Sequence, residues 1–333
     1  MRLVIAVTLF VALSVMTSFT AQSTQTGDLR LVSTAWSPFT NDPGQPRVAL
    51  DLVERALERI GLGARTVIVD PAGFTSALLS GEFDGSAAAW KDAERERVLM
   101  FSQPYLENRL ILVGRSGADV SAASLGQLAG KRVAVVEGYS YGDALDFSGA
   151  TLVRSRSEED SLALLLASKT DYTLMDELVV QYLVNTYPTE ARTRLNLGSR
   201  ALVTRPLYFA VKRARPDAEA IVKRFNAQLQ AMIVDRTYHR VLHVSWISAD
   251  VDGDGVSEFV PASDRSGTTE PKSAYALSKT TDQRSTAAPE AKSRFYVGGS
   301  IYPDWGSVPN QYKVDDQQLP DSSRSSPIFR FAW

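Results

Sequence analysis

Oxygen-bearing side chains occur at alternate positions along residues 250–258, a spacing that suits a hard metal ion. Positions 1, 3, 5, 7 and 9 of this stretch supply aspartates, a backbone carbonyl and a glutamate, namely Asp250, Asp252, Asp254, Val256 and Glu258. Ca²⁺ prefers such oxygen ligands, and Gly255 permits the sharp turn that a metal-binding loop needs. We therefore expect a structural calcium site. The alternative is an acidic turn without metal, in which the carboxylates repel one another.

A second group of residues with fixed spacing lies between Leu78 and Tyr105, in LLSGEFDGSAAAWKDAERERVLMFSQPY. It contains L-x-x-G-x-x-D, and then D-x-E-R six residues before F-S-x-P-Y. This pattern resembles the bacterial extracellular solute-binding proteins of the amino-acid type, the ligand-binding subunits of many ABC importers. The resemblance implies that Arg95 binds the substrate carboxylate, because a planar guanidinium can meet both carboxylate oxygens at once.

The same resemblance implies the rest of a ligand site. Asp176 stands where the family's aspartate meets the ligand ammonium; the alternative is that it caps the helix that follows. Ser140, in the glycine-flanked turn GYSYG, is the nearest match to a small polar residue that the family places beside an anion. Aromatic side chains that could line the pocket, or belong to the core instead, are Trp36, Phe39, Phe74, Trp90 and Tyr139.

The stretch before Arg95 departs from the family pattern. Amino-acid binders carry small hydroxyl residues there and a threonine three residues before the arginine. This chain instead has Ala88, Ala89, Trp90, Lys91 and, at the threonine position, Asp92. Compared with the family pattern, this stretch lacks polar contacts to the ligand and adds the large ring of Trp90 and the cation of Lys91. The ligand could therefore be an amino acid, a modified amino acid, another carboxylate, or an aromatic or cyclic compound.

Strands and helices alternate along the chain, as parallel α/β lobes require. Val53, Ala56, Leu57 and Ile60 show the spacing of one helix face, with Gly61 as the C-terminal cap. Strands are expected at 65–69, in KRVAVVEG and in DYTLMD, and helices at 74–81, in SEEDSLALLLAS and in PDAEAIVKRFNAQLQAMIVD. We expect an α/β fold.

The resemblance covers about residues 28–247 and implies the two-lobe periplasmic-binding-protein fold of type II. The first lobe is discontinuous, so that the chain crosses between the lobes near 110–114 and 205–213. The expected segments are a first lobe (28–114 and 206–247), a second lobe (115–205), the aspartate-rich loop (248–262), a linker or surface coil (263–293) and an aromatic-rich extension (294–333). Exposing so many aromatic residues to water is costly, and we therefore expect the extension to dock on another surface. Its final segment, IFRFAW, is expected to add an edge strand to a lobe.

The N-terminus predicts export. Arg2, an apolar run over 3–16 and small polar residues up to 21 form a secretory signal peptide. The chain has no cysteine and hence no site for a lipid anchor. A net charge of -2 gives no basic footprint for nucleic acid. We expect a periplasmic protein.

Three classes of function remain open. The first is a binding protein that closes on a small solute and delivers it to an ABC permease. The second is a sensing or assembly protein recognised by a periplasmic sensor domain. The third, which we rank last, is a dehydratase or lyase using Glu137, Asp176 and Glu177 as acid or base. His239 and His243 have the spacing of zinc ligands on a helix but lack a third ligand in the sequence, so no zinc site is expected.

Overall fold

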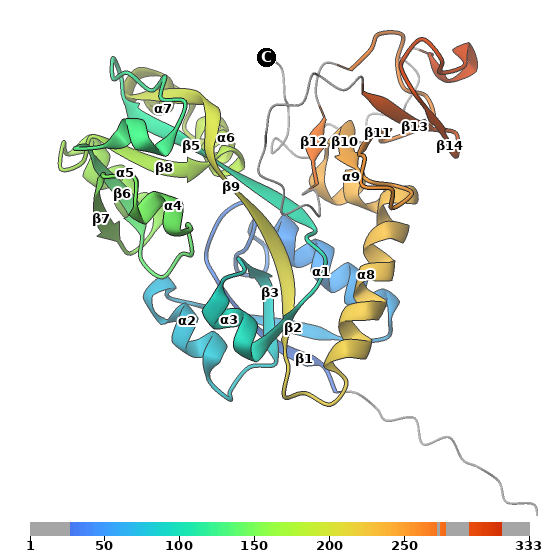
Figure 1. The fold of residues 1–333 in the computed structure, drawn as a ribbon, viewed down its shortest axis with the longest axis horizontal. Coiled ribbons are helices and arrows are strands. Elements are labelled where there is room, and N and C mark those ends of the chain that lie inside the picture. The colour runs from blue at the N-terminus through green and yellow to red at the C-terminus, as the bar shows by residue number, and fades with distance from the viewer. Residues whose placement is uncertain (1–26, 272–273, 278–292, 315–333) are drawn as a thin grey trace, which may run out of the picture.

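The computed structural model describes residues 27–271, 274–277 and 293–314. The expected signal peptide, most of the expected linker and the final strand IFRFAW lie outside these residues. In the described part, two α/β lobes and a smaller C-terminal sheet surround two long strands (Figure 1). No helix in this part is long and apolar enough to cross a membrane.

The first lobe is built on a parallel core of strands in which β1 pairs with both β2 and β3. Its elements are β1 (Leu29–Thr34), α1 (Val48–Arg59), β2 (Ala64–Val69), α2 (Pro71–Leu79), β3 (Gly85–Ala89), α3 (Ala93–Val98), β4 (Leu99–Phe101) and, from the returning chain, α8 (Ala218–Val234) and α9 (Thr237–Leu242). Val53, Ala56 and Leu57 of α1 are buried, and Gly61 adopts a positive φ of 74° just beyond the helix. The helix predicted from their spacing is therefore confirmed.

The second lobe has the same kind of core, with β6 parallel to β7 and β8. Its elements are the 3₁₀ helix η1 (Leu125–Leu128), β6 (Arg132–Val136), α4 (Asp143–Asp146), β7 (Thr151–Ser155), α5 (Glu158–Leu166), β8 (Tyr172–Asp176), α6 (Glu177–Thr186) and α7 (Pro188–Arg194). Ser157 caps α5 by accepting a hydrogen bond from the Asp160 backbone N–H, at 3.1 Å. The predicted strands and capped helix of this lobe are thus confirmed.

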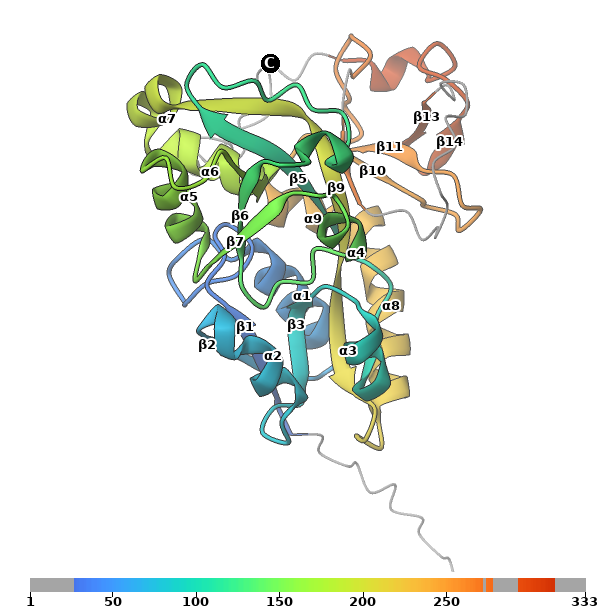
Figure 2. The same cartoon turned by 60° about the vertical axis from the view of Figure 1, so that its left-hand side comes forward.

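Two long antiparallel strands, β5 (Leu106–Arg115) and β9 (Leu195–Lys212), join the lobes and contain the expected crossings. They complete a nine-stranded sheet in the order β2-β1-β3-β9-β5-β8-β6-β7, with β4 pairing with β9. Gly85 lets β3 approach β9 closely, since a Cβ there would lie 1.9 Å from the Ala210 carbonyl oxygen. The predicted two-lobe α/β fold is confirmed, and one continuous sheet runs through both lobes (Figure 2).

The chain beyond the first lobe forms a separate five-stranded sheet in the order β12-β10-β11-β13-β14. Its elements are β10 (Trp246–Ala249), β11 (Glu258–Pro261), β12 (Tyr275–Ala276), β13 (Arg294–Val297), β14 (Ser300–Tyr302) and the 3₁₀ helix η2 (Asn310–Tyr312). The pair Tyr275–Ala276 falls in the range expected to be linker or coil and is instead a strand parallel to β10. Its aromatic side chain packs against the main core, which the polar composition of this segment does not signal.

Aromatic residues of the extension supply the core of this sheet. Phe295, Val297 and Val308 are buried there, and Trp246, Phe259, Tyr302, Trp305 and Tyr312 pack around them. The Phe295 and Trp305 ring centroids are 5.2 Å apart. These described aromatics dock on one another and on β10 and β11.

Candidate ligand-binding cleft

Arg95 lies between the lobes, held by α3, and is only 3% exposed. Its Nη1 donates to the Trp90 carbonyl at 2.9 Å, and its Nη2 donates to Thr75 Oγ1 at 3.1 Å. Nη2 also donates, at 3.2 Å, to the Gly138 carbonyl of the second lobe. Burial lowers the pKa of Arg95, and the Asp92 charge opposes that shift. The guanidinium therefore contacts both sides of the cleft.

Asp92, at the position where the family has a threonine, connects the same two sides. Its Oδ1 accepts the Arg95 backbone N–H at 2.8 Å and caps α3, and its Oδ2 lies 3.3 Å from Arg95 Nε. Ser140 Oγ of the second lobe donates to Asp92 Oδ2 at 2.6 Å. Burial opposes ionisation, but the hydrogen bonds from Arg95 and Ser140 and the Arg95 charge lower the pKa of Asp92 below its ordinary value.

Aromatic rings from both lobes fill the space beside Arg95. The Trp36 ring centroid lies 4.6 Å from that of Phe39, 5.6 Å from Trp90 and 5.7 Å from Tyr139. Phe74 lies under the Arg95 guanidinium, with 5.4 Å between Cζ and the ring centroid. A cavity of about 30 Å³ remains, and its lining includes Trp36, Phe74, Trp90, Arg95, Tyr139 and Ser140. That volume suits a water molecule rather than an amino acid, so the described cleft is closed.

Asp176 lies outside this lining, at the end of β8, and is almost fully buried. Its Oδ1 accepts the Leu178 backbone N–H at 2.7 Å and so caps α6. Its Oδ2 accepts the Arg109 backbone N–H at 2.9 Å and the Asn108 amide at 3.2 Å. Burial raises the pKa of Asp176 to about 7 although these hydrogen bonds oppose the shift. Asp176 therefore acts as the N-terminal cap of α6, which is the alternative to a ligand contact given in the sequence analysis.

Asn108, on β5, links Asp176 to the aromatic rings. Its Oδ1 accepts the Trp90 indole N–H at 2.7 Å, while its Nδ2 donates to Asp176. Asn108 is fully buried, so this amide carries a chain of hydrogen bonds from the first lobe to the second.

Glu158, the first residue of α5, is not among the residues predicted from the sequence. Its side chain is buried, and its Oε2 has no hydrogen-bond partner among the described residues. Burial raises the pKa of Glu158 to about 8, and the neighbouring Asp176 adds to the rise. The S-E-E-D start of α5 explains the omission, because acidic residues in a first helical turn normally serve only the helix dipole.

The other candidates for acid–base or metal chemistry lie apart from this site. Glu137 is exposed, and Glu177 pairs with Arg109 at 2.9 Å. His239 is buried with Nε2 2.9 Å from the Val260 carbonyl oxygen, and burial lowers its pKa to about 4. His243 ends α9 in a left-handed conformation.

The aspartate loop connects β10 and β11 in an antiparallel hairpin. Three carboxylate oxygens lie within 4.8 Å of one another in this loop, one each from Asp250, Asp252 and Asp254. Glu258 is fully buried and accepts the Val251 backbone N–H at 2.9 Å. Arg294 of β13 faces this group and lies 2.6 Å from an Asp254 oxygen and 3.0 Å from Glu258 Oε1.

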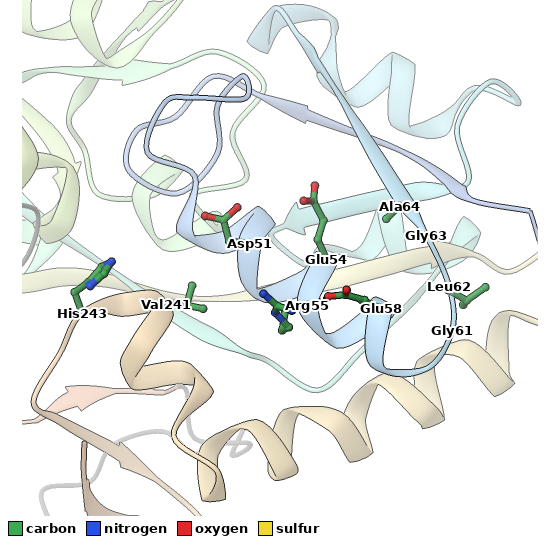
Figure 3. A pocket seen from close by; sticks show the side chains of 10 residues that line it. All are labelled: Asp51, Glu54, Arg55, Glu58, Gly61, Leu62, Gly63, Ala64, Val241 and His243. Atoms are coloured by element: carbon green, nitrogen blue, oxygen red, sulfur yellow. Dashed lines mark hydrogen bonds and ion pairs between the residues drawn. The ribbon is translucent and has the colours of Figure 1, made fainter. Parts of the chain in front are cut away.

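A larger hollow of about 750 Å³ lies elsewhere on the first lobe, between α1, the loop 61–64 and the end of α9 (Figure 3). Its acidic side chains have basic partners: Asp51 and Glu54 pair with Arg47, and Glu58 pairs with Arg55. None of the predicted ligand residues lines it. Its size therefore does not make it the candidate site.

Two lobes joined by antiparallel strands, with a buried arginine between them, define the class of two-lobe solute-binding proteins. Residues 31–249 match the family model of the bacterial extracellular solute-binding proteins, family 3. The chain belongs to this family, which confirms the resemblance seen in its sequence.

Two solved structures show the fold. An ancestral arginine-binding protein bound to arginine is 23% identical, with a TM-score of 0.56, and the likeness covers 65% of this chain and 97% of that one. An arginine transport system periplasmic binding protein from Legionella pneumophila is 20% identical, with a TM-score of 0.54 and the same shares, 65% and 97%.

A sensor protein is also similar in sequence. The virulence sensor protein BvgS of Bordetella bronchiseptica is 28% identical over 166 residues, which make up 49% of this chain. The match spans 13% of the length of BvgS.

Proposed function

We propose that the protein binds a small carboxylate-bearing solute, an amino acid or an analogue, between its lobes and delivers it to an ABC importer in the periplasm. The observation that carries this proposal is Arg95, a buried guanidinium at the meeting of the two lobes. When the lobes separate, Arg95 loses its hydrogen bond to the Gly138 carbonyl, and Asp92 loses its hydrogen bond from Ser140. A solute carboxylate can then bind Arg95 with two parallel hydrogen bonds.

Closure on a solute requires contacts with both lobes, because a ligand shifts a conformational equilibrium only through its different affinity for the two states. The cleft offers such contacts: Trp36 and Trp90 from the first lobe and Tyr139 and Ser140 from the second. Membership of a solute-binding family and the exposed or ion-paired state of Glu137 and Glu177 favour a binding protein over an enzyme.

The test is a thermal-shift and calorimetry screen of the exported chain against amino acids, other small carboxylates and cyclic analogues. A solute at a hundred times its dissociation constant should stabilise the protein by about 2.7 kcal/mol. Arg95→Lys should abolish the shift, because a point charge cannot reproduce the guanidinium geometry. Arg97→Lys, on the exposed side of α3, is the matched control. No shift with any compound, or an undiminished shift in Arg95→Lys, contradicts the proposal.

A sensing role is the second candidate, favoured by the similarity to BvgS and by the closed cleft. In this role a periplasmic sensor domain, rather than a permease, recognises the protein. A deletion strain separates the two: loss of uptake of the identified solute indicates transport. Intact uptake with a lost transcriptional response to the same solute indicates sensing.

We also propose that Asp250, Asp252, Asp254, the Val256 carbonyl and Glu258 bind a structural Ca²⁺. The support is the convergence of three aspartate oxygens beside a buried glutamate whose Oε1 makes no hydrogen bond of good geometry. Arg294 faces the same carboxylates, so metal binding requires this side chain to move aside. The ion would fix the β10–β11 hairpin and the strands that pack on it.

A further inference from the structure

We propose that Glu158, together with the indole of Trp36, forms a subsite for an organic cation, an ammonium or guanidinium group carried by the solute. This inference rests on the proposed function and specifies the chemistry of the ligand: a molecule that offers a carboxylate to Arg95 and a positive charge to Glu158. It gives the cation-binding role to Glu158 in place of Asp176.

The burial of Glu158 is the first observation. The side chain belongs to a residue only 9% exposed, yet its Oε2 finds no hydrogen-bond partner among the described residues. No described lysine, arginine or histidine forms an ion pair with it. A buried carboxyl oxygen without a partner costs free energy, so such groups need an explanation.

Trp36 supplies the second observation from the opposite lobe. Its Nε1 is also buried without a hydrogen-bond partner. The indole N–H is close enough to lower the pKa of Glu158, yet it does not reach hydrogen-bonding geometry. Two incompletely satisfied polar groups therefore face each other across the cleft, next to the cavity that Trp36 lines.

The surroundings of this pair suit a cation. The Trp36, Trp90 and Tyr139 rings lie 5.5 to 5.7 Å from one another, between centroids, and present aromatic surface from both lobes. Aromatic faces attract ammonium and guanidinium groups, more strongly when the site is desolvated. The charged neighbours that affect Glu158 are acidic, Asp176 and Glu159. A bound cation would supply the positive charge that this part of the cleft lacks.

Asp176 is less suited to the role. Its two oxygens already accept hydrogen bonds from the N–H groups of Leu178, Arg109 and Asn108. Arg95 cannot serve Glu158 either, because its guanidinium is committed to Trp90, Thr75, Gly138 and Asp92. Among Asp92, Asp176 and Glu158, Glu158 is the one with a buried oxygen that has no hydrogen-bond partner.

The experiment compares L-arginine with two analogues that each lack one cation. L-citrulline replaces the guanidinium by a neutral urea, and 5-guanidinopentanoic acid lacks the α-ammonium. We expect the wild-type protein to bind L-arginine at least about tenfold more tightly than one of these analogues, the effect of one hydrogen bond to a charged group. The weaker analogue identifies which cation occupies the subsite.

Glu158→Gln keeps the shape but removes the charge, and should reduce that discrimination to less than about threefold. Glu159→Gln, an exposed neighbour on the same helix turn, is the control and should keep it. Equal binding of all three compounds by the wild-type protein, or undiminished discrimination in Glu158→Gln, overturns the inference. Preference for a solute without any cation overturns it as well but leaves the proposed function intact. Absence of binding by every carboxylate in the screen overturns both.

A ligand-free measurement tests the same group independently. If Glu158 has no partner in the protein, Glu158→Gln should melt at the same temperature as the wild type or above it at pH 8. If Glu158 instead holds the fold through a structural contact, the variant melts lower or fails to fold, and the inference is overturned.

Discussion

Ser140 Oγ of the second lobe donates a 2.6 Å hydrogen bond to Asp92 Oδ2 of the first. The same oxygen of Asp92 lies 3.3 Å from Arg95 Nε. The protein therefore places one of its own carboxylates beside the arginine expected to bind a solute carboxylate. The Asp92–Ser140 bond and the Arg95–Gly138 bond together hold the closed cleft.

Removing the Ser140 hydroxyl should favour the open form. A hydrogen bond to a charged group contributes about 1.5–3 kcal/mol, so Ser140→Ala should raise the ratio of open to closed protein by about tenfold or more. Small-angle X-ray scattering of the solute-free protein should show a larger radius of gyration. Exposed Ser199→Ala is the control. An unchanged radius in Ser140→Ala would mean that this bond does not hold the lobes together.

Stability should fall as the pH rises from 6.5 to 8.5. The folded-state pKa values of Glu158 and Asp176 are raised to about 8 and about 7, chiefly by burial. The folded protein therefore binds more protons than the unfolded chain in this window, and stability is lost as pH rises through these values. His239, with a folded-state pKa lowered to about 4, adds stability as the pH rises through its ordinary value of 6.5, so most of this opposing effect is complete at the start of the window. Denaturant titrations should show the fall, and Glu158→Gln should flatten it. Stability that rises over this range contradicts the assignment.

Calcium should raise the melting temperature, and a chelator should lower it. Calcium at a hundred times its dissociation constant adds about 2.7 kcal/mol. Asp252→Asn should remove the difference between calcium and EGTA, while Asp42→Asn, an exposed aspartate of the first lobe, should keep it. Arg294→Gln should strengthen calcium binding, since the arginine faces the same carboxylates. Identical melting with calcium and with EGTA would exclude the site.

The core of the C-terminal sheet offers a matched pair of substitutions. Phe295→Ala removes a fully buried ring and should cost about 3–5 kcal/mol of the stability of this sheet. Phe147→Ala, at a residue 86% exposed in the second lobe, should change stability by less than about 0.5 kcal/mol. Chemical denaturation followed by tryptophan fluorescence measures both. Equal effects would show that Phe295 does not support the sheet.

Periodicity and local signals were enough to predict much of the fold. The apolar spacing of Val53, Ala56 and Leu57 predicts α1, and Ser157 marks the start of α5. These features depend on residues close in sequence. The two-residue strand β12 is too short to show alternation, and its position depends on its pairing with β10.

The candidate site was only partly predictable for the same reason. The motif places Arg95, and the structure gathers the predicted Trp36, Phe74, Trp90, Tyr139 and Ser140 around it. The link between Asp92 and Ser140 joins residues 48 positions apart and exists only when the lobes meet. Glu158 could not be distinguished from an ordinary acidic residue in a first helical turn without knowing that it is buried near the Trp36 indole.

Asn108 is the middle member of a hydrogen-bond chain that runs from Trp90 in the first lobe to Asp176 in the second. Trp90 donates to its oxygen and its nitrogen donates to Asp176, so the dipoles of this chain point the same way and reinforce one another. A change of charge on Asp176 therefore reaches the Trp90 indole through a single amide. We therefore expect the fluorescence emission of Trp90 to respond to the protonation of Asp176, a carboxyl group of the other lobe.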